Sequence, residues 1–133
     1  DAVLLSELKK IQIENMKKSG TDSLIQKASD PTFDPFFHAP TLVIISGDKN
    51  DKHIDINCGA AAENLMLAAE SLNIGSCIMT SVETLFLNDS NDELKRKLRF
   101  PPEYQFICAI TLGYKDCETP AAAPRKENTV TYL

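Results

Sequence analysis

The side chains that could carry chemistry are few in this sequence and stand far apart. The four cysteines form no C-x-x-C pair of the kind that builds zinc or dithiol sites, and three of them lie inside apolar runs, as expected for buried free thiols. The two histidines, His38 and His53, are not at metal-ligand spacing. No G-x-G-x-x-G follows a strand-like run, and neither H-E-x-x-H nor a Ser/His/Asp constellation is present. These patterns argue against a metal site, a nucleophilic hydrolase and a separate dinucleotide-binding domain.

One pair of cations is conspicuous because of its surroundings. Arg125 and Lys126 follow a proline and alanine run near the end of the chain, in AAAPRKENTV. Such a run favours an extended course along a surface over a compact coil. From the residues alone, a solvated pair of charges is the simpler interpretation, and a specific contact with an anion is the alternative.

Composition limits the class of protein. With 133 residues, 43% hydrophobic and 25% charged, the chain has the length and make-up of a single globular domain over 1–133. Its formal charge of −5 gives no support for nucleic acid or an anionic membrane as a partner, because those surfaces bind cationic patches. No run reaches the roughly 18–20 apolar residues of a membrane span, and no secretion signal is evident. We therefore expect a cytoplasmic protein.

Hydrophobic spacing predicts the first half of the fold. Leu4, Leu8 and Ile11 recur at helical spacing, which predicts an amphipathic helix that ends at Gly20. The stretch SDPTFDPFFHAP is rich in proline and phenylalanine and predicts an irregular loop whose aromatic rings pack in the core or border a pocket. TLVIISG, residues 41–47, is apolar without alternation and predicts a strand covered on both faces and central in a sheet.

The second half contains the most distinctive segment, INCGAAAENLMLAAESLNIGS at 56–76. An apolar stripe within it is flanked by further alanine, leucine and methionine, which predicts a helix buried nearly all round (Ala61, Leu65, Ala68, Leu72). Because so small a domain offers little covering surface, we expect a homodimer interface there. Ser90 with Glu93 forms a capping-box pattern for a helix that stops before Pro101, and YQFICAITLGY predicts a second buried strand that ends at Gly113.

The order of these segments resembles the flavin-dependent nitroreductase family. The resemblance runs through FFHAPTLVIISGD, AAAENLMLAAESLNIGSCIM, LKRKLRFPPEYQFICAITLGYKD and PAAAPRK. It implies the C-terminal two thirds of an α+β fold: a central mixed or antiparallel sheet flanked by helices, in a homodimer, with a C-terminal arm over about 114–133. It also implies FMN at the dimer interface. The implied reaction is hydride transfer from NAD(P)H through flavin N5 to a nitroaromatic, a quinone or a similar small-molecule acceptor, by a ping-pong mechanism in which the flavin carries the redox step.

The resemblance also assigns the binding residues. The segment CIMTS matches the place where the family lays its backbone beside the flavin ring, with Thr80 and Ser81 as backbone N–H donors to N5 and O4 and with Ile78 and Met79 packing on the ring face. Arg125 matches the family arginine that contacts the FMN phosphate, a role that suits the planar, permanently charged guanidinium, and Lys126 assists it. Without the resemblance, CIMTS would be read as an ordinary loop after a helix.

One departure from the family pattern leaves two hypotheses open. The R-R-S-x-R-like cluster and the N-x-Q-P-W-like strand entry that usually begin family members are absent, so we expect either an N-terminally trimmed chain or a naturally short relative. The first hypothesis is an FMN-dependent NAD(P)H oxidoreductase. The alternative is a non-catalytic dimeric domain that binds flavin weakly or not at all. Reductive dehalogenation and flavin destruction are further reactions of the superfamily that nothing in the sequence selects.

Overall fold

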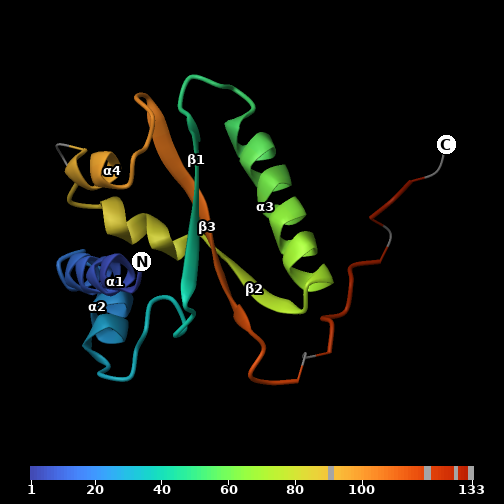
Figure 1. Ribbon diagram of the computed structural model, residues 1–133, viewed down its shortest axis with the longest axis horizontal. Helices are drawn as coiled ribbons and strands as arrows, with labels where there is room; N and C mark the ends of the chain where they lie inside the picture. Colours follow the sequence, from blue (N-terminus) through green and yellow to red (C-terminus); the bar gives the residue numbers. More distant parts are fainter. Residues whose placement is uncertain (90–91, 119–120, 128, 132–133) are drawn as a thin grey trace.

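A computed structural model describes residues 1–89, 92–118, 121–127 and 129–131 of the chain. A three-stranded antiparallel sheet stands at the centre, with one long helix on one face and the other helices on the opposite face, an α+β arrangement (Figure 1). The elements in chain order are α1 (Ala2–Lys17), α2 (Asp22–Ser29), β1 (Thr41–Asp48), α3 (Ile54–Ser71), β2 (Ile74–Met79), the 3-10 helix η1 (Ser81–Phe86), α4 (Glu93–Lys97) and β3 (Tyr104–Tyr114).

The middle strand, β3, is apolar on both faces. It pairs with β1 on one side and with β2 on the other, in the order β1-β3-β2. Successive side chains of a strand point to opposite faces, and the neighbours Ala109 and Ile110 are both fully buried. Ala109 packs in a core cluster with Leu8 of α1, and Ile110 packs in a second cluster with Ala62 of α3. The predicted strand at 104–114 is therefore confirmed, and it joins two separate cores.

The prediction for β1 is confirmed in one respect and wrong in another. Both of its faces are covered, because Leu42 and Ile44 pack on the first cluster while Ile45 packs on the second. Its position in the sheet is not central: β1 is an edge strand of the described sheet, hydrogen-bonded to β3 alone. The apolar run shows that helices cover both faces of β1. It does not show whether β1 has a neighbouring strand on each side.

The N-terminal helix forms as predicted. The Asp1 carboxylate caps α1 by accepting hydrogen bonds from the backbone N–H groups of Val3 and Leu4 at 2.9 and 3.1 Å. A short second helix, α2, was not predicted; Gly20, at φ +71, makes the turn between the two. The loop that follows is irregular as expected, and of its adjacent phenylalanines Phe36 is fully buried in the core while Phe37 is 66% exposed.

The long helix α3 is buried on one face only within a single chain. Its buried residues are Cys58, Ala62 and Ala69. The apolar stripe from the sequence lies about 70° further round, at roughly 100° per residue, and most of it is exposed (Ala61, Ala68 and Leu72 exposed, Leu65 half-buried). The expectation of a helix buried nearly all round is not met by the described part of one chain.

The capping residue predicted for the fourth helix, Ser90, lies outside the described residues. In the structure, the carboxylate of Asp89 accepts hydrogen bonds from the backbone N–H groups of Leu94 and Lys95 at 3.0 and 3.1 Å, at the start of α4. The helix ends at Lys97, before Pro101, as predicted. None of the helices in the described ranges is both long and apolar enough to cross a membrane.

The close approach of β1 to α3 yields a prediction about two glycines. A Cβ at Gly47 would lie 2.7 Å from Ile54 Cγ1 and 3.1 Å from Cys58 Sγ, whereas a Cβ at Gly59, in α3, would meet nothing within 4 Å. We expect Gly47→Ala to lower the free energy of unfolding by about 1–3 kcal/mol through overpacking. Gly59→Ala should raise it by about 0.5–1 kcal/mol, because alanine favours the helix.

Urea denaturation of the two variants at one protein concentration measures both effects. Equal stability of Gly47→Ala and the wild type would show that α3 is free to move away from β1.

Candidate functional site

The segment singled out in the sequence, CIMTS, lies where an edge strand turns into a helix. Cys77, Ile78 and Met79 are the last residues of β2, Thr80 caps η1, and Ser81 is its first residue. β2 pairs with β3 on one side only in the described sheet. Alternate residues of an edge strand direct their N–H and C=O groups away from the neighbouring strand, so backbone donors are available along this edge.

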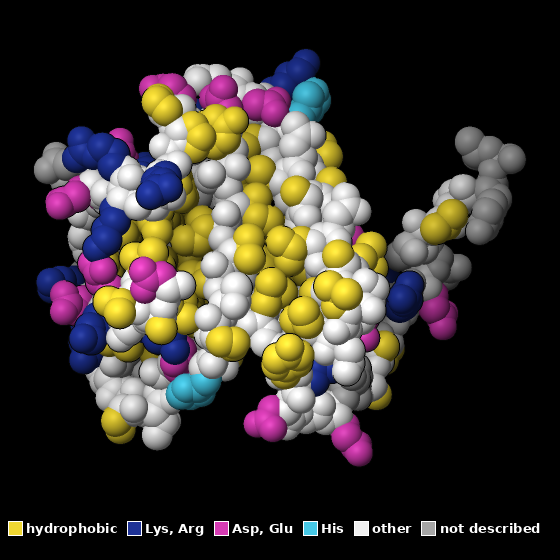
Figure 2. All heavy atoms as spheres, viewed as in Figure 1, with side chains coloured by type: hydrophobic (Ala, Val, Ile, Leu, Met, Phe, Trp, Pro, Cys, Tyr) yellow, Lys and Arg dark blue, Asp and Glu magenta, His cyan; other side chains and the backbone are white. Residues whose placement is uncertain are grey.

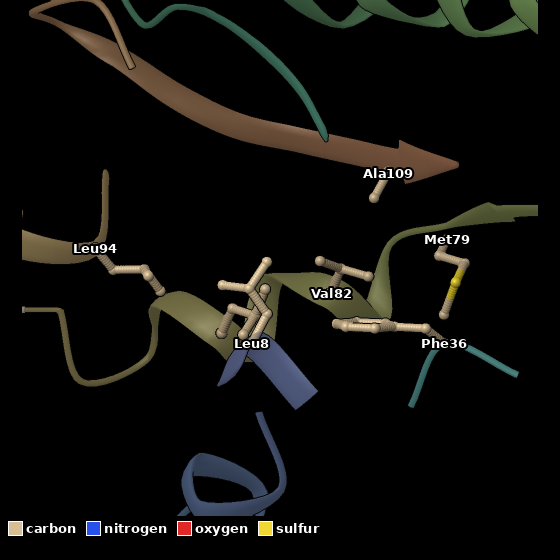
Figure 3. Close-up of a cluster of buried hydrophobic side chains, with 7 residues drawn as sticks. Leu8, Phe36, Met79, Val82, Leu94 and Ala109 are labelled. Carbon is tan, nitrogen blue, oxygen red and sulfur yellow. The ribbon is translucent and has the colours of Figure 1, made fainter. Parts of the chain in front are cut away.

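Two of the predicted contact residues have opposite surroundings. Met79 is 6% exposed, and its side chain lies in the first core cluster with Phe36 and Val82 (Figure 3). Ile78 pairs with Ile110 on the opposite face of the sheet and is 48% exposed. The Ile78 side chain is therefore accessible to a ligand, whereas Met79 anchors the strand and leaves only its main chain for such a contact.

The turn after β2 exposes the two predicted donor residues. Thr80 and Ser81 are both exposed. The Thr80 carbonyl accepts a hydrogen bond from Glu83 N at 3.0 Å. Because a peptide unit is planar and trans, its N–H points opposite to its C=O, so this bond directs the Ser81 N–H away from the first turn of η1. A ligand oxygen or nitrogen can accept from a donor placed in this way.

Side-chain amides of α1 donate to backbone carbonyls of η1, and these contacts were not predicted from the sequence. Gln12 Nε2 donates to the Ser81 carbonyl at 3.2 Å, and Asn15 Nδ2 donates to the carbonyls of Thr84 and Leu85 at 3.0 and 2.9 Å. Asn88 Nδ2 in turn donates to Asn15 Oδ1 at 2.9 Å. Gln12 and Asn15 are buried polar residues on the core face of the predicted helix, and their types at that spacing are the signal that could have revealed them.

A hollow of about 500 Å³ lies at the far end of β2. It is formed by the loop 37–40, by 75–77 of β2 and by the end of β3 with the residues that follow. Its volume is within the range of about 300–1,000 Å³ typical of small-molecule sites. An exposed backbone edge and an accessible isoleucine fit a planar, partly polar ligand laid along β2. The hollow adjoins the start of that edge, and its lining does not include Ile78, Thr80 or Ser81.

The predicted phosphate-binding cations lie elsewhere. The C-terminal tail begins at Tyr114, which is 89% exposed, and Lys115 holds its root to α3 through hydrogen bonds of 2.9 Å to both carboxylate oxygens of Glu70. Beyond that point the tail runs away from the body (Figures 1 and 2). Arg125 and Lys126 are exposed, and within the described ranges neither makes an ion pair or hydrogen bond with the rest of the chain. The structure thus does not bring them to Thr80 and Ser81 in the same chain.

The partly buried carboxylate of Asp34 is held by contacts within the fold. Burial opposes ionisation of Asp34, but hydrogen bonds from Lys9 and from the backbone of Phe36 and His38 outweigh it and lower the pKa of this carboxyl. His38 Nδ1 lies 3.3 Å from the same carboxylate on an exposed loop. Among the described residues, no three histidine, cysteine or acidic side chains are grouped in a way that could hold a metal ion.

Comparison with known proteins defines the class of this domain. A model of the nitroreductase family matches residues 1–114. The chain therefore belongs to the nitroreductase family.

A curated relative with a stated activity covers part of the chain. It is the 4-nitrobenzoate reductase of Nocardioides sp. (strain LMS-CY), which is 30% identical over 89 residues, 66% of this chain. The match spans 34% of that relative, about a third of its length.

Two solved structures share the fold over the whole chain. A nitroreductase with bound FMN from Bacteroides fragilis NCTC 9343 superposes with a TM-score of 0.87 at 28% identity, over 100% of this chain and 72% of that one. A nitroreductase with bound FMN from Desulfitobacterium hafniense DCB-2 gives a TM-score of 0.81 at 21% identity, over 100% and 71%. The second likeness concerns the fold alone.

The contrast among the four thiols gives a prediction for this site. Burial raises the pKa of Cys58, with nearby Asp55 and Asp51 adding to it, and burial with the neighbouring Cys58 raises the pKa of Cys108. Cys77, beside Ile78, and Cys117 are exposed. Because the exposed thiolate is the reactive species, we expect a thiol reagent at pH 7.5 to modify Cys77 and Cys117 at least about tenfold faster than the other two.

Mass spectrometry of the labelled peptides measures the four rates. Fast modification of Cys58 in the folded chain would show that α3 does not pack on the sheet as described.

Proposed function

We propose that this protein is an FMN-dependent oxidoreductase that takes a hydride from NAD(P)H and passes it to a nitroaromatic, a quinone or a similar small-molecule acceptor. The observation that carries the proposal is the likeness of the entire chain to a nitroreductase with bound FMN, at a TM-score of 0.87 and 28% identity. A nitroaromatic acceptor is supported by the relative named as a 4-nitrobenzoate reductase. Alternation of donor and acceptor in one site implies ping-pong kinetics.

The chain's own residues would bind and orient the cofactor. The Ser81 N–H points away from η1, and the exposed Thr80 lies beside it, so the backbone at this turn suits the polar edge of the ring. The half-exposed Ile78 offers an apolar contact for the ring face. Bound FMN would supply the acceptance and release of the hydride. Fixed backbone donors near the ring would stabilise the negative charge that develops on reduction, since they need no reorganisation.

Arg125 and Lys126 are proposed to contact the FMN phosphate. Both are exposed on a tail that is rooted at Lys115 and is otherwise free of ion pairs in its described part. A guanidinium presents two parallel donors to phosphate oxygens, whereas an ammonium acts as a point charge. The arginine should therefore contribute more than the lysine.

A homodimer is part of the proposal. The stripe of Ala61, Leu65, Ala68 and Leu72 is largely exposed, and Leu67 and Ile56 on the outer side of the same helix are 59% and 72% exposed. Yellow side chains gather over α3 and beside it in Figure 2. Contiguous apolar surface of this kind marks interaction sites in soluble proteins, and a second copy would cover it in a two-fold arrangement.

We expect FMN binding to depend on Arg125 more than on Lys126. Losing a hydrogen-bonded charge opposite a phosphate weakens binding by roughly 30-fold or more when the contact is desolvated, so Arg125→Ala should show a loss of that size. Lys126→Ala should show a smaller loss. Fluorescence quenching of FMN at fixed salt measures the three dissociation constants.

Equal affinity of wild type and Arg125→Ala would remove the phosphate role from the tail. A colourless wild-type protein that does not quench FMN would overturn the proposed enzyme and support a non-catalytic dimeric domain.

We expect the wild type to sediment as a dimer at micromolar concentration and Ala68→Glu to dissociate at least about tenfold more readily, because a charge would be buried in the interface. Glutamate at this exposed helical position should leave the fold of each chain intact. Leu87→Glu is the matched control, since Leu87 is 54% exposed and directly follows η1, which packs in the first core cluster and not in the cluster with α3. A well-folded wild-type monomer would contradict the dimer.

A further inference from the structure

The buried amide of Gln12 is not explained by stability. Gln12 is 1% exposed, and its Oε1 has no hydrogen-bond partner among the described residues. A buried polar atom without a partner destabilises the folded state, and an apolar side chain of the same shape avoids that cost. A glutamine at such a position is explained if its amide nitrogen has a role.

The amide nitrogen of Gln12 reaches the turn between β2 and η1. Gln12 Nε2 donates to the Ser81 carbonyl at 3.2 Å, and Thr84 Oγ1 donates to the same oxygen at 2.9 Å. The Ser81 carbonyl and the Val82 N–H belong to one planar peptide unit, so these bonds fix the plane that follows Ser81. The bond from Glu83 N to the Thr80 carbonyl, at 3.0 Å, fixes the plane that precedes it. Both peptide planes next to Ser81 are therefore held.

The side-chain amides of Gln12, Asn15 and Asn88 support different parts of η1. Asn15 Nδ2 bonds the carbonyls of Thr84 and Leu85, and Asn88 Nδ2 bonds Asn15 Oδ1, so this pair grips the middle of the 3-10 helix. Gln12 lies three residues earlier on α1 and reaches the first residue of η1 instead. Of the three, Gln12 alone contacts the peptide unit that adjoins the exposed donors.

We propose that Gln12 is a positioning residue for the cofactor: by binding the Ser81 carbonyl it orients the peptide donors at the start of η1 toward FMN. The inference rests on the proposed function, in which the N–H groups of Thr80 and Ser81 bind the flavin. Donors that are oriented before the ligand arrives bind it without a reorganisation cost. Gln12 itself touches no ligand, and it acts from the far side of the turn.

The test compares Gln12→Met with the wild type in the full chain. Methionine is unbranched and close to glutamine in length but cannot donate to the Ser81 carbonyl, which still accepts from Thr84 Oγ1. Met16→Leu, a volume-conserving change at another buried position of α1, is the matched control. Four quantities are measured: the melting temperature, the hydrogen exchange of the Glu83 amide without FMN, the FMN dissociation constant and the absorption band of bound FMN.

We expect Gln12→Met to melt at or above the wild-type temperature, because the unpaired buried oxygen is gone. The Glu83 amide, which donates to the Thr80 carbonyl, should exchange about fivefold faster. FMN should bind roughly 5- to 10-fold more weakly with a shifted absorption band, as loss of one hydrogen bond implies. Met16→Leu should match the wild type in exchange, in affinity and in the band.

Several outcomes would overturn the inference. If wild type and Gln12→Met bind FMN equally with the same absorption band, Gln12 does not position the cofactor, and the proposed function is untouched. If exchange at the Glu83 amide is unchanged, Gln12 does not hold the turn. If the wild type does not bind FMN, the proposed function fails and the cofactor role of Gln12 fails with it, while the exchange data still decide whether Gln12 holds the turn.

Discussion

The rest of the structure depends on one constraint: the middle strand must be buried on both faces. Ala109 and Ile110 are both fully buried and point in opposite directions. An open sheet of three strands leaves both of its faces uncovered, so each apolar face must pack against a layer of helices. The layer of α1 and η1 covers one face and α3 covers the other, while β1 and β2 become the edges. The candidate site lies along one of those edges.

Periodicity in the sequence predicted the elements that this constraint governs. The helix at the N-terminus, the long alanine-rich helix and the strand at 104–114 all appear where their apolar patterns place them. Periodicity could not predict the order of the strands. Apolar side chains on both faces of residues 41–47 show that helices cover the strand, but they do not show which strands lie beside it in the sheet. The short elements α2 and β2 were missed for a related reason: segments of eight and six residues contain too little periodicity to stand out.

The candidate site was found by resemblance, and physical chemistry explains why residue types alone did not suffice. Its donors at Thr80 and Ser81 are backbone groups, which every residue except proline carries, so side-chain identity gives no signal there. Gln12 and Asn15 hold η1, which begins at Ser81, and they lie about 70 residues earlier in the chain. A contact of that range requires the folded packing of α1 on η1. By contrast, Met79 could not be assigned to the core from its type, since an apolar side chain suits a ring face and a core equally.

The ion pair at the root of the tail has a consequence for the reach of its charges. Lys115 is bonded to Glu70, and Arg125 lies ten positions further along the chain. At no more than about 3.6 Å per residue, the guanidinium is confined to within roughly 40 Å of α3. A tethered group in such a volume behaves as if it were dissolved at a millimolar effective concentration near its target. Because Lys115 directly follows Tyr114, the last residue of β3, the sheet sets the origin of that tether, and the Glu70–Lys115 bond fixes the direction in which the tail leaves it.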